Sequence, residues 1–526
     1  MFAISRLSVH YLKRTASSHS NASSSRDDDN LYLIVEDKNQ LLLEEEDFHR
    51  GNIMGDNQNH RDMPQQRKGF LKGLMETNKW LLFMLTTGLM VYFTVWLMFF
   101  HVSGDGLYYP LDKFHKRIPS QWVHRAVVYN TYDFDEFSNY TIIPPNLKTL
   151  LPDDVDRLPP SNGTKMVCYY NFPALNDTLR RLQAVDIEPH LCTHINLAFA
   201  SVLDSKIYLS DEQLQVVEEV MLLKTKNKKL KVLISVGGAG DDNGFPNMVK
   251  DHENRKIFIK SILDYVKTHK FDGVDLDWEF PGTNANPKTK QRMHFTQLLH
   301  EIRNEINRQE HFKFLLTVAV AAPVFIVDVA YDVSYMNEYV DFVNLMSYDY
   351  HFYTKFTPFT GMNSPLYARE TDIGYFSTLN INYTVHYWLN KGIAREKLVV
   401  GLPTYGHSFR LVNSYNHGIN AAANDYGTLG ADGFVGYNEL CVFLRRNQIT
   451  PMFDLVTRSA FATRHHEWVS FDDRQSLTYK TEFIRANRFA GVMVYALNTD
   501  DHAGVCMENN TTKFPLTKTI KYALTG

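Results

Sequence analysis

The chain has 526 residues, of which 44% are hydrophobic and 22% charged, and a formal net charge of −4; this is ordinary globular composition with enough length to bury a large core. Because 55 Lys and Arg residues are balanced by 59 Asp and Glu residues, the chain lacks the basic surplus typical of nucleic-acid binding, and we expect no nucleic-acid partner. Its four cysteines show no C-x-x-C spacing, which argues against a disulfide-rich scaffold and a compact zinc site; two bridges or four free thiols both remain open, according to the compartment.

Residues 1–79 are rich in Ser, Asp, Glu and Asn without a sustained hydrophobic period, which predicts a disordered cytoplasmic tail. Residues 80–101 contain no Asp, Glu, Lys or Arg and match the ~20 apolar residues that a helix needs to cross a bilayer. We therefore predict a transmembrane helix here, rather than a buried core helix or a cleaved signal peptide. Basic residues gather on its N-terminal flank, at Arg67, Lys68, Lys72 and Lys79. This predicts a single-pass type II membrane protein whose N-terminus faces the cytoplasm.

Residues 102–164 hold several X-Pro steps and no long apolar period, which indicates a stem. Six triplets for N-glycosylation lie after the predicted membrane helix, at Asn139, Asn162, Asn176, Asn382, Asn509 and Asn510. Oligosaccharide is added outside the cytosol. We therefore expect the bulk of the chain to be extracellular or in the lumen of the secretory pathway.

Over residues 165–522, short apolar and β-rich runs alternate with amphipathic stretches, which predicts an α/β protein with a (β/α)8 TIM barrel. Eight such runs occur, at 166–171, 193–200, 230–236, 271–280, 314–322, 341–348, 397–404 and 489–497. The longest gap separates the seventh run from the eighth. Its Gly-, Asn- and Tyr-rich middle predicts a small α+β insertion over 409–470.

The fourth run carries three acids at two-residue intervals. Because side chains alternate along a strand, Asp275, Asp277 and Glu279 share one face, which we predict to point into the barrel. Glu279 lies at the C-terminal end of this run, where such barrels react. Like charges so close together raise at least one carboxyl pKa, so that one acid stays protonated and can act as a general acid. Two other interpretations are a solvated acidic strand and a divalent-metal site of oxygen ligands.

The segment DGVDLDWE at 272–279 resembles the D-x-x-D-x-D-x-E signature of glycoside hydrolase family 18, the chitinases and chitinase-like proteins. Four further segments resemble family landmarks in the same order: SVGG at 235–238, MSYDY at 346–350, GLPTYG at 401–406 and GVMVY at 491–495. The resemblance implies that Glu279 protonates the glycosidic oxygen while the substrate's own acetamido group attacks the anomeric carbon. It implies that Asp277 steadies that group, that Tyr348 donates a hydrogen bond to it, and that Asp275 belongs to the same catalytic set. No metal or other cofactor is required.

The resemblance also implies residues that bind a chitin or N-acetylglucosamine oligosaccharide around the catalytic acids: Tyr169, Trp278, Phe280, Met346, Asp349, Tyr405 and Tyr495. Two disulfide bonds follow from the same comparison, Cys168–Cys192 and Cys441–Cys506.

Several positions depart from the family pattern. Tyr495 replaces a tryptophan beneath the cleaved sugar, His407 replaces an arginine, and the other departures are Ala239, Phe280 and Thr354. Because aromatic faces bind sugar rings, this loss is expected to weaken binding along a long polymer more than the chemistry. We expect a membrane-anchored hydrolase of β-1,4-linked N-acetylglucosamine. The alternatives are an endo-β-N-acetylglucosaminidase acting on glycoprotein glycans and a non-catalytic chitin- or glycan-binding lectin.

Overall fold

The computed structural model describes residues 140–142, 163–173, 181–240, 244–283, 290–506 and 512–525. The predicted tail, the predicted membrane helix over 80–101 and nearly all of the predicted stem lie outside these residues. Within the described ranges, no helix is both long enough and apolar enough to cross a bilayer.

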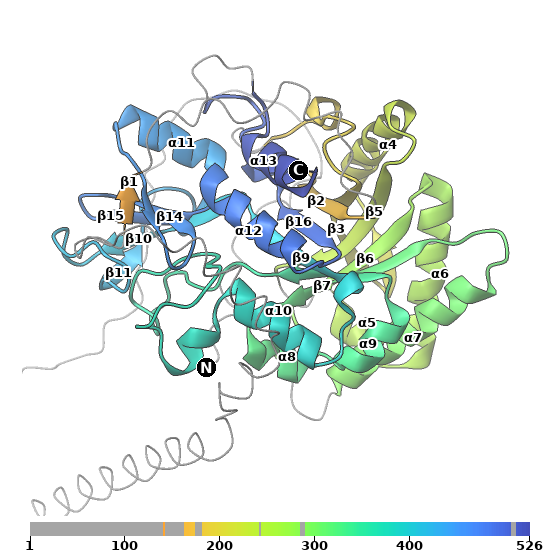
Figure 1. Ribbon diagram of the computed structural model, residues 1–526. Coiled ribbons are helices and arrows are strands. Elements are labelled where there is room, and N and C mark those ends of the chain that lie inside the picture. Colours follow the sequence, from red (N-terminus) through yellow and green to blue (C-terminus); the bar gives the residue numbers. More distant parts are fainter. Residues whose placement is uncertain are drawn as a thin grey trace, which may run out of the picture. The chain divides into compact units, whose positions relative to one another are not determined.

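Eight parallel strands form a closed barrel (Figure 1). Each barrel strand pairs with the next one along the chain, and β16 pairs with β2 to close the ring. The barrel strands are β2 (Lys165–Asn171), β3 (His194–Leu203), β5 (Lys231–Gly238), β6 (Gly273–Trp278), β7 (Leu315–Ala321), β8 (Phe342–Met346), β9 (Leu398–Pro403) and β16 (Gly491–Tyr495). They coincide with the eight predicted runs, so the predicted (β/α)8 barrel is confirmed.

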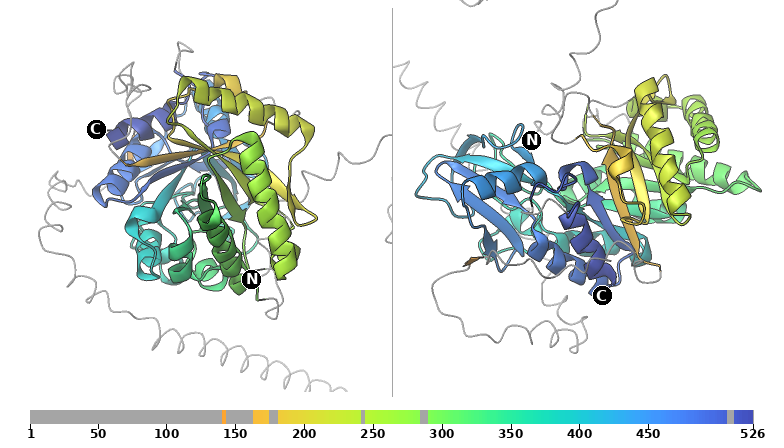
Figure 2. Two further views of the ribbon diagram at one scale, coloured as in Figure 1. Left: turned by 90° about the vertical axis from the view of Figure 1, so that its right-hand side faces the viewer. Right: turned by 90° about the horizontal axis from the view of Figure 1, so that it is seen from above.

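Helices surround these strands (Figure 2, left). They are α4 (Asp211–Lys226), α5 (Phe245–Val249), α6 (His252–His269), α7 (Gln291–Arg308), α8 (Val324–Ala330), α9 (Val333–Tyr339), α10 (Ile381–Asn390), α12 (Arg474–Ala486) and α13 (Pro515–Thr525). Polar residues begin two of the longer ones: the side chains of Ser210 and Asp251 accept backbone N–H groups in the first turns of α4 and α6, as N-caps do. Shorter elements are β4 (Lys206–Tyr208), η3 (Ala184–Asp186), η5 (Gly374–Thr378), η6 (Arg395–Lys397) and η7 (Leu497–Thr499).

A second, antiparallel sheet is inserted in the chain between β9 and α12, beside the barrel (Figure 2, right). Its elements are β10 (Tyr405–Leu411), β11 (Ala423–Tyr426), β12 (Phe434–Gly436), α11 (Tyr437–Arg446), β13 (Met452–Asp454), β14 (Ser459–Arg464) and β15 (Glu467–Phe471). The short strand β1 (Tyr140–Ile142) pairs with β13 at its edge. Only Thr404 separates β9 from β10, so the inserted sheet starts directly at the C-terminal end of a barrel strand.

The barrel strands divide their side chains between two apolar clusters. The outer cluster joins the strands to the helices and contains Val274, Leu276 and Trp278 of β6. The inner cluster contains Tyr169 and Tyr348. This alternation directs Asp275, between Val274 and Leu276, into the barrel, as predicted.

Strand β5 approaches β6 closely at Gly237, which lies opposite Asp277. The φ of Gly237 is +115°, and a Cβ at this position would lie 2.0 Å from the carbonyl oxygen of Asp277. Only glycine fits such a conformation and such a distance. The glycine therefore allows the backbone of Asp277 to sit where it does.

Candidate active site

Asp275 is fully buried inside the barrel, where four side chains donate hydrogen bonds to it. The hydroxyls of Tyr169 and Ser235 donate to Oδ2, at 2.6 and 2.8 Å. The Thr317 hydroxyl and the Asn344 amide donate to Oδ1, at 2.6 and 3.1 Å. Burial raises the pKa of Asp275, although these donors oppose the rise. Each oxygen of Asp275 thus accepts two hydrogen bonds. Within the described ranges, no cluster of His, Cys, Asp or Glu is arranged to hold a metal ion.

Asp277 lies two residues further along β6 and is 2% exposed. Its Oδ1 is buried and has no hydrogen-bond partner among the described residues. Burial raises the pKa of Asp277 well above its ordinary value, and the charges of Glu279 and Asp275 raise it further. Because an unpaired buried oxygen costs free energy, Oδ1 is suited to accept a hydrogen bond from a ligand.

Glu279 directly follows β6 and is partly exposed at the C-terminal end of the barrel. Desolvation raises the pKa of its carboxyl group to about 7, and the negative charge of Asp349 adds to the rise. A carboxyl group with this pKa holds a proton near neutral pH and can still release it. The predicted rise in at least one carboxyl pKa is found in all three acids of β6.

Asp349 belongs to the loop after β8, where its φ of 57° is in the left-handed region. Its Oδ1 accepts hydrogen bonds from the Tyr405 hydroxyl at 2.5 Å and from Nε2 of His407 at 2.7 Å. Both donors lie on β10, and the Tyr405 ring stacks on Phe434 of β12 with centroids 4.4 Å apart. The inserted sheet therefore supplies the partners of an acid that acts on Glu279.

Four tyrosines meet at this end of the barrel. The Tyr495 ring lies 5.5 Å from that of Tyr169, 5.9 Å from that of Tyr348 and 6.2 Å from that of Tyr405, measured between centroids. Burial raises the pKa of all four hydroxyl groups, so each keeps its proton and can donate. Among the residues that the structure describes, the Tyr348 hydroxyl donates to the Met493 sulfur, at 3.6 Å, a weak acceptor that a ligand oxygen would replace.

The prediction that Trp278 binds substrate is wrong. Trp278 is 4% exposed, stacks on Phe245 of α5 at 5.2 Å and meets Phe295 of α7 edge-on at 5.7 Å. The alternation that turns Asp277 inward turns Trp278 toward the helices.

The other predicted contact residues differ in their exposure. Tyr169 is 1% exposed and its hydroxyl is engaged by Asp275, so it supports that acid rather than presenting a free surface. Phe280 is partly exposed but packs against the outer cluster, whereas Met346 packs against the inner one. The structure thus gathers Met346 with Tyr348, Tyr405 and Tyr495, and leaves Phe280 on the helix side.

Several residues of the site were not predicted. Ser235, Thr317 and Asn344 hold Asp275 from three neighbouring strands. Asn171 donates to the Tyr495 hydroxyl at 3.4 Å, and its backbone N–H donates to the Asn498 side chain at 2.8 Å. The sequence feature that could have identified such donors is a single polar residue within an otherwise apolar strand, as at Thr317 and Asn344.

Both disulfide bonds implied by the resemblance are present, Cys168–Cys192 and Cys441–Cys506. Of the glycosylation triplets, Asn382 is partly exposed in the first turn of α10; Asn139, Asn162, Asn176, Asn509 and Asn510 lie outside the described residues. Asp272, the first acid of the motif, lies at the other end of β6 and pairs with Lys224 and Lys231.

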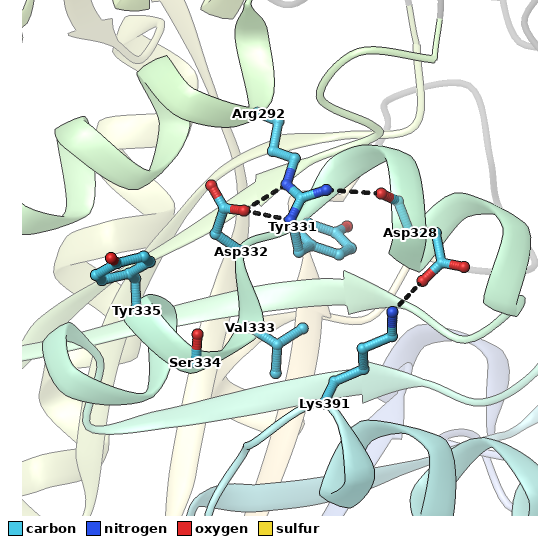
Figure 3. A pocket seen from close by; sticks show the side chains of 8 residues that line it. All are labelled: Arg292, Asp328, Tyr331, Asp332, Val333, Ser334, Tyr335 and Lys391. Carbon is cyan, nitrogen blue, oxygen red and sulfur yellow. Dashed lines mark hydrogen bonds and ion pairs between the residues drawn. The ribbon is translucent and has the colours of Figure 1, made fainter.

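Two pockets lie apart from the catalytic acids. One of about 200 Å³ lies over α7, α8 and α9, and its charges are already paired, Arg292 with Asp332 and Lys391 with Asp328 (Figure 3). The other, of about 390 Å³, is lined mainly by apolar and aromatic residues that include Phe376. Neither pocket is lined by Asp275, Asp277 or Glu279. The candidate active site is therefore identified by the side chains that meet around these three acids.

Comparison with known proteins agrees with this constellation. The sequence profile described as glycosyl hydrolases family 18 matches residues 165–500. Mouse chitotriosidase-1 is 36% identical over 376 residues, which cover 69% of this chain and 78% of that protein. The crystal structure of the Group IV chitinase of Ostrinia furnacalis is similar with a TM-score of 0.64 and 33% identity, over 69% of this chain and 100% of that one. Human YKL-39, described as a pseudo-chitinase with retained chitooligosaccharide binding, gives a TM-score of 0.65 and 32% identity over the same shares.

Proposed function

Because the chain belongs to glycosyl hydrolase family 18, we propose that it hydrolyses β-1,4 linkages between N-acetylglucosamine residues in chitin or its oligomers, with Glu279 as general acid and base. The observation that carries this proposal is the pKa of about 7 at Glu279, next to an Asp277 oxygen without a partner among the described residues. Cleavage of a glycosidic bond needs an acid that keeps its proton near neutral pH.

In the first step, the carbonyl oxygen of the substrate's acetamido group attacks the anomeric carbon, and the bond from that carbon to the leaving oxygen breaks. Glu279 donates its proton to the leaving oxygen, so that no alkoxide has to form. Oδ1 of Asp277 accepts the acetamido N–H, and the Tyr348 hydroxyl donates to the acetamido oxygen. The contact with Asp277 strengthens as positive charge develops on the oxazolinium intermediate, because the N–H becomes more acidic, whereas the Tyr348 hydroxyl orients the acetamido oxygen before it attacks.

In the second step, the Glu279 carboxylate removes a proton from water, and the water oxygen attacks the anomeric carbon. The bond from that carbon to the acetamido oxygen breaks and the acetamido group is restored. Two successive displacements at one carbon retain its configuration. Asp275 does not contact the substrate in this mechanism, and its four hydrogen-bond donors hold it in place next to Asp277 on the strand. Its negative charge helps to keep Asp277 protonated until positive charge develops on the substrate.

The second candidate is a glycan-binding protein without activity. It is favoured by Tyr495, which offers less stacking surface than the tryptophan common in the family, and by the similarity to YKL-39, described as a pseudo-chitinase. The complete set of acids on β6 and the pKa of Glu279 favour the enzyme. An endo-β-N-acetylglucosaminidase would use the same acids and differ only in its substrate.

The test is hydrolysis of labelled N-acetylglucosamine oligomers of increasing length by the wild type and by Glu279→Gln. We expect the variant to bind the oligomers and to lose about 10²–10⁴-fold in kcat, because the amide has no acidic proton. Fully deacetylated oligomers should resist the wild type, since they lack the attacking group. Binding without cleavage by the wild type would support the lectin, and cleavage of glycoprotein glycans alone would support the endo-β-N-acetylglucosaminidase.

We also propose that this hydrolase is anchored as a single-pass type II membrane protein, with residues 165–522 outside the cell or in the lumen of the secretory pathway. The uncharged segment 80–101 and its basic N-terminal flank support this.

A further inference from the structure

His407 connects the inserted sheet to the catalytic acids. Its Nε2 lies 2.7 Å from Oδ1 of Asp349. Because an ionised carboxylate only accepts hydrogen bonds, Nε2 carries the hydrogen and donates it. The His407 side chain is 11% exposed, whereas that of Asp349 is 47% exposed, so the imidazole holds the carboxylate from its protein side.

We propose that His407 is a positioning residue for Asp349, and that the charge on its ring sets how strongly the Asp349 carboxylate acts on Glu279. This inference rests on the proposed role of Glu279 as the general acid. It concerns a residue that does not belong to the catalytic set and that differs from the arginine common at this position in the family.

Among the described residues that contact His407, one side chain is charged, that of Asp349. On its own strand, Tyr405 lies 5.7 Å away between ring centroids and shares Oδ1 of Asp349. Phe434 of β12 and Phe352 of the loop after β8 pack at 6.4 and 5.5 Å.

On the remaining neighbour, β15, the paired residue is Ser470. Burial raises the pKa of Tyr405 well above its ordinary value, so its hydroxyl stays neutral. Among these neighbours only Asp349 carries a charge, and a proton on His407 therefore acts first on Asp349.

The charge on His407 then reaches Glu279 through Asp349. When the imidazole is protonated, its positive charge offsets the Asp349 carboxylate, whose negative charge otherwise helps Glu279 to keep its proton. When the imidazole is neutral, Asp349 acts on Glu279 without this compensation. Because an imidazole carries a charge only when it is protonated, Glu279 keeps its proton to a higher pH than it would beside a permanent cation. An arginine would compensate Asp349 at every pH.

The experiment measures the titration of Glu279 directly, by ¹³C NMR of the carboxyl carbon in glutamate-labelled protein without substrate. The Glu279 signal is assigned by its absence in Glu279→Gln. In His407→Arg we expect the midpoint of the Glu279 titration to fall by about 0.5 to 1 pH unit, since a unit charge is added close to Asp349. In His407→Gln, which donates without a charge, we expect the midpoint to stay at or above that of the wild type.

The matched control is His417→Arg, which adds the same charge at an exposed histidine without an ion pair among the described residues. An unchanged midpoint in His407→Arg, or an equal shift in His417→Arg, overturns the proposal. Should His407→Arg fail to fold, His407→Lys supplies the permanent cation. The titration needs no turnover: a wild type that does not hydrolyse oligomers refutes the proposed function alone, and hydrolysis with an unmoved titration refutes the role of His407 alone.

Discussion

Glu279 keeps its proton because the fold removes water from its carboxyl group, and this has a consequence for stability. Its pKa is about 7 in the folded chain, whereas a glutamate in an unfolded chain has a pKa of about 4.3. Between these two values the folded state binds more protons than the unfolded state. The contribution of Glu279 to stability is therefore fully present below the unfolded pKa and is lost as the pH rises through the folded one.

We predict that Glu279→Gln gains stability relative to the wild type as the pH rises from 5 to 8. The amide does not titrate, so the free energy of unfolding of the variant relative to that of the wild type should rise by about 1–3 kcal/mol between pH 5 and pH 8. Urea unfolding at both pH values measures the difference. Glu338→Gln, at an exposed glutamate, is the control. A difference between Glu279→Gln and the wild type that does not change with pH would refute the pKa on which the mechanism depends.

Tyr495 occupies the place of a larger aromatic residue. It is partly exposed, lies against three tyrosine rings and accepts a hydrogen bond from Asn171. Its stacking face is smaller than that of tryptophan, although its hydroxyl adds a polar contact. Substrate binding is therefore expected to respond to this residue more than the proton transfer does.

We predict that Tyr495→Trp lowers the KM for longer N-acetylglucosamine oligomers by about 3–10-fold and changes kcat little, because a wider ring face adds about 0.5–1.5 kcal/mol of stacking. Steady-state kinetics over a series of oligomers measures both constants. Tyr495→Phe, which removes only the hydroxyl, separates the contribution of the ring from that of the hydrogen bond to Asn171. Equal KM values for the wild type and Tyr495→Trp would show that this ring does not contact the sugar.

At the scale of elements, the barrel strands were predictable because each is a short run buried on both faces and bounded by turn residues. The start of the inserted sheet was not predictable from the sequence. The run ending at Thr404 continues directly into β10 at Tyr405 without a turn signal, whereas the insertion was placed at 409. The strands of the insertion also alternate between two small clusters of their own, which local sequence does not assign to a partner.

The acids of the site were predictable from the strand period, and their surroundings were not. The donors to Asp275 come from four other segments, up to 106 positions away in the sequence, and only the register of the closed barrel brings them together. The same period implies an outward side chain for Trp278, whereas the resemblance predicted a substrate contact. The packing against Phe245 shows that the local rule was the better guide.

The approach of β5 to β6 at Gly237 yields a prediction at this scale. Gly237→Ala should destabilise the protein by about 2–4 kcal/mol and reduce activity strongly, because the new Cβ would lie 2.0 Å from the carbonyl oxygen of Asp277 and would displace that residue. Thermal unfolding and oligomer hydrolysis measure the two effects. The control is Gly374→Ala, which also has a positive φ but has no atom within 4 Å of its Cβ. If both variants lose the same stability, backbone strain rather than the contact with Asp277 is the cause.

At the scale of the whole molecule, the barrel and the inserted sheet act together at the site. The acids of β6 belong to the barrel, while Tyr405 and His407, which hold Asp349, belong to β10. A buried ion pair joins the same parts, since Lys480 of α12 contacts Asp472 directly after β15. The position of the inserted sheet is therefore expected to affect the charge at Glu279, and not only the shape of the surface.

The two disulfide bonds are relevant to the compartment in which the protein resides. All four cysteines of the chain are joined in two disulfide bonds, and such bonds persist in oxidising compartments rather than in the cytosol. The predicted type II orientation would place both bonds on the oxidising side of the membrane. The charge pattern and the cysteine pairing are thus consistent with the predicted orientation.

We predict that a tag at residue 1 is protected from protease added to intact cells, while residues 165–522 carry glycans removable by a glycosidase. The basic residues before the segment 80–101 should hold the N-terminus in the cytoplasm. Permeabilised membranes are the positive control for the protease. Replacing Asn382, a partly exposed residue of α10, by Gln should remove the mass of one glycan without changing the orientation. A tag that is digested on intact cells would contradict the type II orientation, because digestion places the N-terminus outside the cytoplasm.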